Sequence, residues 1–569
     1  MKSFVRTITV IIICMAAIML AAACQNEGIG AESSDYMPSL SGTSQDQNGE
    51  VLKLNGQIKY SPKNYLMWDN WYVEMNGMVH LIHLKWLKSG VNYDMEAENK
   101  RGFGHAVSTD LVHWEERSDI LKVSDSDNEL DVDYRYTGSA IVHNGRCYIF
   151  YTMRKWGGQR IGVAWSDDME NWTEYAGNPI LEPDSEYFIT FDKNNPGTSN
   201  NKLWGDSIDC RDFLVIKDPD GEGFYGYFVA SAEGEFTTPT AVVGLAYSTD
   251  LLNWEQLGIV YRPDGVSMPE MIDVFEVDGK WYMTLTTGKN NGGINMFSDP
   301  YVVRAQIYAV SDSPKGPFIE DKEDNVVFGG GTYGSGYSSR SIMFDGIRRM
   351  LYTDNNGGDA VLSFPKNVGL NDKGQLRAYY ASDLMESIRT GELTTEITAQ
   401  PSTSFAWPTH GGHWLKKEDQ AYICNADRNS WQACFFDSIS KNMELCFTVD
   451  ASSDCSSFGI VLSNASDLSK PESIQNIIVL DRENDRVYMT DYMWEFKNAR
   501  YFDFDDNLEY EIRMILAGNT VEVYINDEFV FNSAISNLGR NHTGLFVNDG
   551  SIKINQLKLY KVESENKKS

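Results

Sequence analysis

One short motif recurs through the first 320 residues of the chain. It reads Ser-x-Asp-x-x-x-Trp, and a fourth copy carries Phe318 where the tryptophan would stand: "GHAVSTDLVHWEE" (104–116), "GVAWSDDMENWTE" (162–174), "GLAYSTDLLNWEQ" (244–256) and "YAVSDSPKGPFIE" (308–320). An aspartate at this place ties a turn through its side chain. We expect the tryptophan to pack between neighbouring units, so we interpret these aspartates as architecture and not as chemistry.

A second element accompanies the motif, a turn followed by an alternating aromatic strand. It occurs in five segments: "NGMVHLIHLKW" (76–86), "NGRCYIFYTMR" (144–154), "GFYGYFVASAE" (223–233), "DGKWYMTLTTG" (279–288) and "GIRRMLYTDNN" (346–356). Alternation with a period of two and turns rich in glycine predicts strands and hairpins. A repeat of roughly 60–80 residues corresponds to one four-stranded blade. The sequence therefore predicts an all-β fold, with a five-bladed β-propeller over residues 56–380.

The pattern changes after residue 380. "ASDLMESIRTGEL" (381–393) predicts a short helix within a linker over 381–399. Short strands with turn signals every 8–12 residues then predict a β-sandwich over 400–562, and a polar tail at 563–569 is expected to be disordered. Disulfides are possible in this part of the chain, although the sequence does not give their pairing, among Cys424, Cys434, Cys446 and Cys455.

The N-terminus indicates export. Lys2 and Arg6 precede the apolar run "ITVIIICMAAIMLAAAC" (8–24), a pattern typical of a secretory signal peptide over residues 1–23. Cys24 follows three alanines and resembles the lipidated cysteine of a bacterial lipobox. The polar stretch 24–55 predicts a flexible tether. We expect a cell-surface lipoprotein anchored at Cys24 or a secreted protein; simple cleavage near Ala23 and an uncleaved anchor are the alternatives.

Composition narrows the partners. The net charge of −32 would repel nucleic acid, and the only membrane contact we expect is through the lipid anchor. No cysteine or histidine spacing indicates a zinc site, so we expect neither a metal nor a cofactor. The 14 tryptophans, 30 tyrosines and 26 phenylalanines suit both a β-rich core and a surface that stacks on sugars.

Three carboxylates lie just before, or at the start of, predicted inner strands in three different repeats. They are Asp69 in "LMWDNWY", Asp212 in "IDCRDFLVI" and Glu270 in "SMPEMIDVFEV". A propeller gathers its innermost strands around a central funnel. We therefore expect these side chains to converge there.

The order of these motifs resembles glycoside hydrolase family 32, the β-fructosidases, whose members join a five-bladed propeller to a β-sandwich. "RDF" (211–213) is similar to the family's Arg-Asp-Pro, and "EMIDVF" (270–275) to its extended Glu-Cys-Pro segment. Other segments support the likeness: "FGHAVSTDLVHW" (103–114), "YTGSA" (136–140), "YSSRSIMFDGIRRML" (337–351), "VLSFPKNVGLNDKGQL" (361–376) and "VEVYINDEFVF" (521–531). In place of the family's Asn-Asp-Pro-Asn-Gly, "WDNW" resembles the Trp-Asp-x-Trp of family 68, and Met271 and Ile272 replace Cys and Pro.

The resemblance implies cleavage of β-fructofuranosidic bonds in sucrose or fructans, with retention, through a fructosyl-enzyme. It implies that Asp69 is the nucleophile, Glu270 the acid/base and Asp212 the stabiliser of the transition state. Four further residues are expected to bind substrate or orient these groups: Trp68, Trp71, Ser139 and Arg211.

Three other functions stay open at this point. A fructosyltransferase would use the same intermediate and pass the fructosyl group to a sugar. An arabinan- or xylan-type furanosidase would use the same propeller with three acidic residues. A non-catalytic carbohydrate-binding surface lipoprotein would explain the drift at Phe213, Met271 and Ile272.

Overall fold

The computed structural model shows a chain built of antiparallel strands. It describes residues 58–63, 65–87, 102–121, 134–155, 158–190, 208–233, 240–263, 269–288, 299, 302, 304–330, 336–354, 360–392, 412–418, 421–435, 442–463, 474–490, 498–504, 508–535 and 542–563. All of them belong to one compact unit, Gln45–Ser569. The predicted signal peptide, Cys24 and the whole predicted tether lie outside the described residues. No helix among the described residues is long and apolar enough to cross a membrane.

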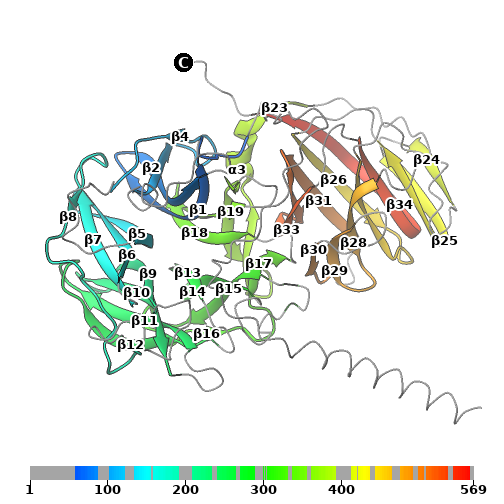
Figure 1. Cartoon of the computed structure of the whole chain (residues 1–569). Helices are drawn as coiled ribbons and strands as arrows, with labels where there is room; N and C mark the ends of the chain where they lie inside the picture. Colours follow the sequence, from blue (N-terminus) through cyan, green and yellow to red (C-terminus); the bar gives the residue numbers. More distant parts are fainter. Residues whose placement is uncertain are drawn as a thin grey trace, which may run out of the picture. The chain divides into compact units, whose positions relative to one another are not determined.

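Four separate sheets form the first part of this unit (Figure 1). The first contains β1 (Tyr65–Met75), β2 (Met78–Leu87), β3 (Gly104–Ser108) and β4 (Glu115–Glu116). The second contains β5 (Tyr134–His143), β6 (Arg146–Lys155), β7 (Gly158–Ser166) and β8 (Thr173–Glu174). The third contains β9 (Cys210–Lys217), β10 (Phe224–Ala232), β11 (Thr240–Ser248) and β12 (Glu255–Tyr261). The fourth contains β13 (Glu270–Val277), β14 (Lys280–Gly288), β15 (Arg304–Ser311), β16 (Ile319–Glu320) and β17 (Val326–Gly330).

The segment predicted as the fifth blade does not form a separate sheet. Its strands open a 17-stranded sheet that continues into the C-terminal half, because β22 pairs with β33 through Tyr379 and Glu528. The described residues thus contain four discrete blade-like sheets instead of five. The strands concerned are β18 (Tyr337–Phe344), β19 (Ile347–Asp354), β20 (Val361–Leu362), β21 (Lys366–Leu370) and β22 (Leu376–Tyr380).

The first strands of these groups lie against one another in a closed order. β1 contacts β5 and β18, β9 contacts β5 and β13, and β13 contacts β18. Each is the strand that the hairpin pattern places innermost. The arrangement is therefore propeller-like, and residues at matching positions of these five strands face a common centre.

The recurring Ser-x-Asp-x-x-x-Trp motif forms turns, as predicted. In the third copy Asp250 accepts hydrogen bonds from the backbone amides of Leu252 (2.9 Å) and Asn253 (2.8 Å), and the indole of Trp254 donates to Leu251 O (3.1 Å). Trp254 also contacts Phe213, on β9 of the same sheet, edge-on, at 4.8 Å between ring centroids. The interpretation of these aspartates as architecture is confirmed.

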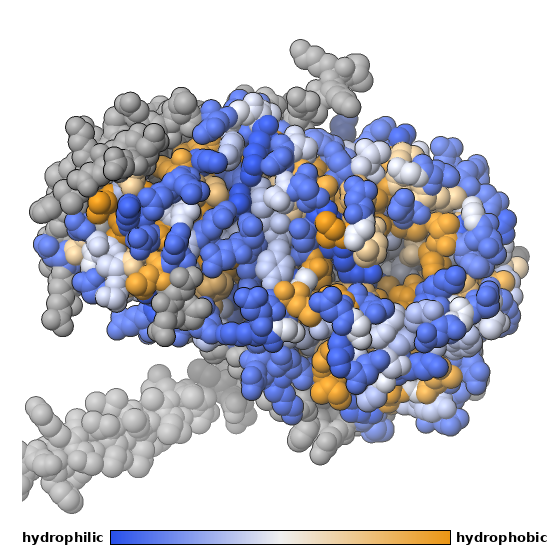
Figure 2. Space-filling model, turned by 180° about the vertical axis from the view of Figure 1, so that it is seen from behind, coloured by the Kyte–Doolittle hydropathy of each residue, from blue (hydrophilic) through white to orange (hydrophobic). Residues whose placement is uncertain are grey.

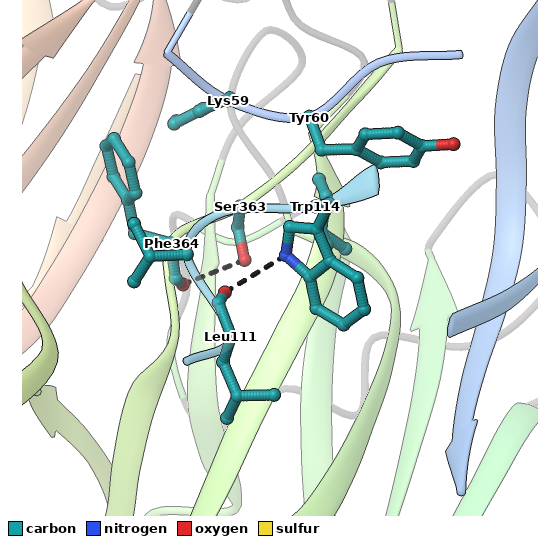
Figure 3. A pocket seen from close by; sticks show the side chains of 8 residues that line it. Lys59, Tyr60, Leu111, Trp114, Ser363 and Phe364 are labelled. Atoms are coloured by element: carbon teal, nitrogen blue, oxygen red, sulfur yellow. Dashed lines mark hydrogen bonds between the residues drawn. The ribbon is translucent and has the colours of Figure 1, made fainter. Parts of the chain in front are cut away.

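The first copy has the same geometry beside the start of the described chain. Figure 3 shows that the indole of Trp114 donates to Leu111 O (3.1 Å), close to Lys59 and Phe364. The narrow hollow drawn there has no room for a sugar ring. It contains none of the three predicted carboxylates.

The C-terminal half is also built of strands, and its described residues form a large cluster of buried aliphatic and aromatic side chains and a smaller one beside it. Its longest strand, β34 (His542–Val562), pairs with four others, β23 (Arg389–Glu392), β25 (Ala421–Phe435), β26 (Met443–Ala451) and β27 (Ser457–Ser463). The remaining strands are β24 (Gly412–Glu418), β28 (Ile474–Asp481), β29 (Arg486–Thr490), β30 (Asn498–Tyr501), β31 (Glu509–Ala517), β32 (Thr520–Ile525) and β33 (Glu528–Ala534). Figure 2 shows one face of the molecule, on which hydrophobic residues lie in small groups among hydrophilic ones.

The linker differs from its prediction. Only one helical turn, α3 (Ser382–Met385), and the 3-10 turn η3 (Glu386–Ile388) form, because Arg389 becomes extended and begins β23. Pairing of β23 with β34 replaces the helical hydrogen bonds that the sequence predicted. Cys446 and Cys455 are free thiols, and the side chains of Cys424 and Cys434 lie outside the described residues.

A buried ionic cluster joins the propeller strands to the C-terminal half. The carboxylate of Glu522, on β32, contacts Lys59 Nζ at 2.9 Å through Oε1 and Lys366 Nζ at 2.8 Å through Oε2. Lys59 Nζ also lies 3.2 Å from Asp354 Oδ2. Burial would raise the pKa of Glu522, but the two lysines outweigh it and lower that pKa to about 2.

Candidate active site

Each of the five inner strands has a register irregularity near the same end. Extra residues lie at Trp68–Asp69 in β1, Thr137 in β5, Asp212–Phe213 in β9, Met271–Ile272 in β13 and Ser338–Ser339 in β18. A β-bulge turns side chains out of the regular alternation and often borders an active site. Here the bulges aim residues from five distant segments at the common centre.

Asp69 is held by two hydroxyl groups from neighbouring strands. Thr137 Oγ1, on β5, donates to Asp69 Oδ2, and Ser338 Oγ, on β18, donates to Asp69 Oδ1. The next residue, Asn70, is fully buried and donates to Ser338 O (3.0 Å) and Thr353 Oγ1 (2.8 Å). Asp69 is therefore a fixed, half-buried group and not a surface charge among aromatic residues.

Asp212 and Glu270 meet at one guanidinium. Arg211 Nη1 lies 2.9 Å from Asp212 Oδ2 and 3.7 Å from Glu270 Oε1. The backbone amide of Met271 also donates to Asp212 Oδ2 (2.9 Å). Asp209 Oδ1 holds the other side of Arg211, 3.2 Å from its Nε. Arg211 thus contacts Asp209 and Asp212 and lies near Glu270, and its orienting role stays a prediction.

The charges of these groups act on Asp69. Burial, together with the negative charges of Asp212 and Glu270, raises the pKa of Asp69 to about 7. The hydrogen bonds from Ser338 and Thr137 act in the opposite direction and limit this rise. These interactions place Asp69, Asp212 and Glu270 in one electrostatic cluster. A group of carboxyls with one buried cation provides the residue types needed for a nucleophile and an acid/base.

Two of the predicted substrate contacts are corrected by the structure. Trp71 is only 1% exposed and packs edge-on against Phe103, 5.3 Å between ring centroids, inside a core shared by the first two sheets. Ser139 is buried and its hydroxyl accepts a hydrogen bond from the amide of Val215 (3.1 Å), which ties β5 to β9. Both side chains are structural because the bulges shift the strand alternation. Trp68 is half-buried and adjoins Asp69 in the chain, and its contact with a sugar stays a prediction.

The sequence prediction missed Thr137, Ser338, Asn70 and Asp209 as parts of the site. The sequence prediction used both segments, "YTGSA" with Thr137 and "YSSRSIM" with Ser338. In the first segment it chose the hydroxyl of Ser139, whereas the structure places the hydroxyl of Thr137 against Asp69. Gly138 is a further signal: a Cβ at this position would lie 1.7 Å from Phe150 O, so only glycine allows the bulge that turns Thr137 toward Asp69.

A second hollow, of about 230 Å³, lies in the C-terminal half between α3 and the strands β26, β31 and β34. Two arginines that line it, Arg389 and Arg513, both bind Glu444. It lies away from the three carboxylates. Within the described ranges no group of histidine, cysteine or acidic residues has the arrangement of a metal site.

Family profiles agree with this geometry. The profile of the glycosyl hydrolases family 32 N-terminal domain matches residues 60–335, and that of the family 32 C-terminal region matches residues 415–561. Together the two matches cover more than half of the chain. The chain belongs to glycosyl hydrolases family 32. The resemblance of "WDNW" to family 68 stays a prediction.

Relatives within family 32 are distant. A levanase from Bacillus sp. (strain L7) is 28% identical over 402 residues, which are 64% of this chain and 38% of that protein. A fructan 1-exohydrolase from Leymus chinensis is 25% identical over 378 residues, 58% of this chain and 54% of that protein. The alignments thus span only about half or less of these relatives.

Solved structures support the fold. A β-fructofuranosidase from Bombyx mori superposes with a TM-score of 0.61 at 17% identity, covering 89% of this chain and 94% of that one. Fructan 1-exohydrolase IIa from Cichorium intybus gives a TM-score of 0.63 at 15% identity, covering 90% and 97%.

Proposed function

We propose that this protein is a retaining glycoside hydrolase that cleaves β-fructofuranosidic bonds in sucrose or fructans through a fructosyl-enzyme intermediate. The observation that carries the proposal is the convergence of Asp69, Asp212 and Glu270 from three inner strands in a chain of family 32. The levanase and fructan exohydrolase relatives support the substrate class.

The roles follow from where charge develops. Asp69 attacks the anomeric carbon while Glu270 protonates the leaving oxygen; Glu270 then removes a proton from the water that releases fructose. Asp212 binds sugar hydroxyls and stabilises the positive charge of the transition state. Its Oδ2 is occupied by Arg211 and Met271, and no described residue donates to Oδ1, which leaves that oxygen for a hydroxyl. Arg211 orients Glu270, and Trp68 borders the sugar.

We also infer the finer architecture. The ring of contacts among β1, β5, β9, β13 and β18 supports β18–β22 as a fifth blade that is hydrogen-bonded to the C-terminal half. The apolar core that β25–β29 and β31–β34 share supports a β-sandwich.

Incubation with sucrose, inulin, levan and arabinan, followed by chromatography of the products, tests the proposed function. We expect free fructose from sucrose or from at least one fructan, and no arabinose. Growth of oligosaccharides at high sucrose would instead show that the protein is a fructosyltransferase, which passes the fructosyl group to a sugar and not to water. Release of arabinose alone would overturn the proposal, and tight sugar binding without turnover would indicate a binding protein.

We further propose that the chain is exported and anchored through Cys24. Expression in a bacterial host with radiolabelled palmitate should label the protein and place it in the membrane fraction, and Cys24→Ala should abolish both. Cys147→Ala serves as the control because Cys147 is a buried thiol of the described fold. Equal labelling of the Cys24→Ala protein and the unsubstituted chain would contradict the anchor.

A further inference from the structure

Ser338 has a left-handed backbone conformation, as Asp212 and Met271 have in the bulges of β9 and β13. It lies in the bulge of β18 with φ +55°, a left-handed conformation that non-glycine residues adopt infrequently. Its side chain is fully buried and donates to Asp69 Oδ1. An uncommon backbone conformation combined with a hydrogen bond to a candidate catalytic group suggests that the conformation serves the site.

The backbone around Ser338 also holds the strand that carries Asp69. Asn70 Nδ2 donates to Ser338 O (3.0 Å) and to Thr353 Oγ1 (2.8 Å), and Thr353 Oγ1 in turn donates to Trp68 O (2.7 Å). The residues on both sides of Asp69 are therefore fastened to β18 and β19. The carboxylate can keep one orientation only while this connection holds.

A buried cation lies two residues further along β18. Arg340 is 2% exposed, and its Nε and Nη2 have no hydrogen-bond partner among the described residues. Burial lowers the pKa of Arg340, and the charges of Asp273, Asp212 and Asp69 oppose that shift. Buried guanidinium nitrogens without a hydrogen-bond partner are costly, and the negative charges of Asp273, Asp212 and Asp69 oppose this cost. The position of Arg340 therefore indicates an electrostatic role.

We propose that Ser338 is a positioning residue for Asp69: its hydroxyl fixes the orientation of the carboxylate and favours its ionised form, and Arg340 adds positive charge from the same strand. The inference deepens the proposed function and rests on the assignment of Asp69 as the nucleophile. It makes β18 part of the catalytic apparatus, although β18 contributes no predicted catalytic residue.

Other charged groups face Asp69 from the remaining inner strands. Asp212 on β9 and Glu270 on β13 raise its pKa, Thr137 on β5 is a neutral donor, and Arg211 lies beyond Asp212 and Glu270. Loss of the Ser338 hydroxyl removes a donor that favours the charged form. The pKa of Asp69 should therefore rise above about 7.

The test compares Ser338→Ala with Ser339→Ala. Ser339 is the next residue, is equally buried, and its hydroxyl has no partner among the described residues, so it is a matched control. Ser338→Gly is a second variant, which removes the hydroxyl and relieves the left-handed backbone. We expect the acid limb of the kcat/KM–pH profile to move up by about one to two pH units in both Ser338 variants. Ser339→Ala should leave it in place.

A second readout needs no turnover. Infrared titration of the carboxyl bands, with Asp69→Asn identifying the band of Asp69, should show the same upward shift in Ser338→Ala. Arg340→Gln should also raise the pH at which the Asp69 band titrates, and Arg340→Lys should raise it less. If neither the acid limb of the kcat/KM–pH profile nor the titration of the Asp69 band moves in the two Ser338 variants, the inference is overturned. The proposed function would stay intact. A shifted band in a protein that hydrolyses no fructoside would support the inference and overturn the proposed function.

Discussion

Replacement of Asp69 by asparagine is expected to lower kcat at least about 10⁴-fold, because Asp69 is the proposed nucleophile and an amide cannot form the proposed covalent intermediate. Asparagine is nearly isosteric and keeps an oxygen for the Ser338 hydroxyl. The melting temperature should therefore change by no more than about 2 °C. Sucrose or fructan hydrolysis together with thermal denaturation measures both quantities.

The hydrolysis rates of substrates with different leaving groups should distinguish Glu270→Gln from Asp69→Asn. A fructoside with an acidic leaving group needs no proton donor, so Glu270→Gln should regain much of its rate on such a substrate, and Asp69→Asn should not. Asp250→Asn is the matched control, since that carboxylate only ties a turn. It should cost stability and leave kcat unchanged. Near-normal hydrolysis by Asp69→Asn would remove this residue from the mechanism.

Glu522→Gln is expected to destabilise the fold by about 3–5 kcal/mol, because it leaves two buried lysines without their shared partner. The effect should appear as a lower free energy of unfolding in urea. We attribute the expected loss of stability to the burial of these charges, and an exposed ion pair serves as the control. Lys280 and Asp312 form such a pair, and Asp312→Asn should change the free energy of unfolding by less than about 1 kcal/mol. Equal effects of the two substitutions would show that the buried cluster does not join the two halves.

The periodicity of the sequence predicted most of the architecture. Hairpin turns, alternating aromatic strands and the Ser-x-Asp-x-x-x-Trp turns are local features, and local features are what sequence patterns record. The three carboxylates were also predicted, because acidic residues in apolar runs at the start of inner strands are uncommon. The number of separate blades was harder to predict. The strands of the expected fifth blade join the C-terminal sheet because β22 pairs with β33, more than a hundred residues further along the chain.

The partners of Asp69 were missed for a physical reason. Whether Thr137 or Ser139 faces the centre depends on a single extra residue in β5, and a shift of one residue exchanges the two faces of a strand. The hydrogen bond from Ser338 joins segments 269 residues apart, and no local pattern records it. Trp71 was misassigned for the same reason, as the bulge at Trp68–Asp69 turns Trp71 into the core.

The five aligned bulges separate the chemistry of this protein from its scaffold. Each hairpin contributes one position to the centre, and these positions hold an aspartate, a threonine, an aspartate, a glutamate and a serine at or directly beside the irregularity. The pairing of the hairpins does not depend on which side chain stands there. The backbone frame therefore sets where the five side chains meet, while their hydrogen bonds and charges couple them, so that a replacement on one strand alters the groups on the others.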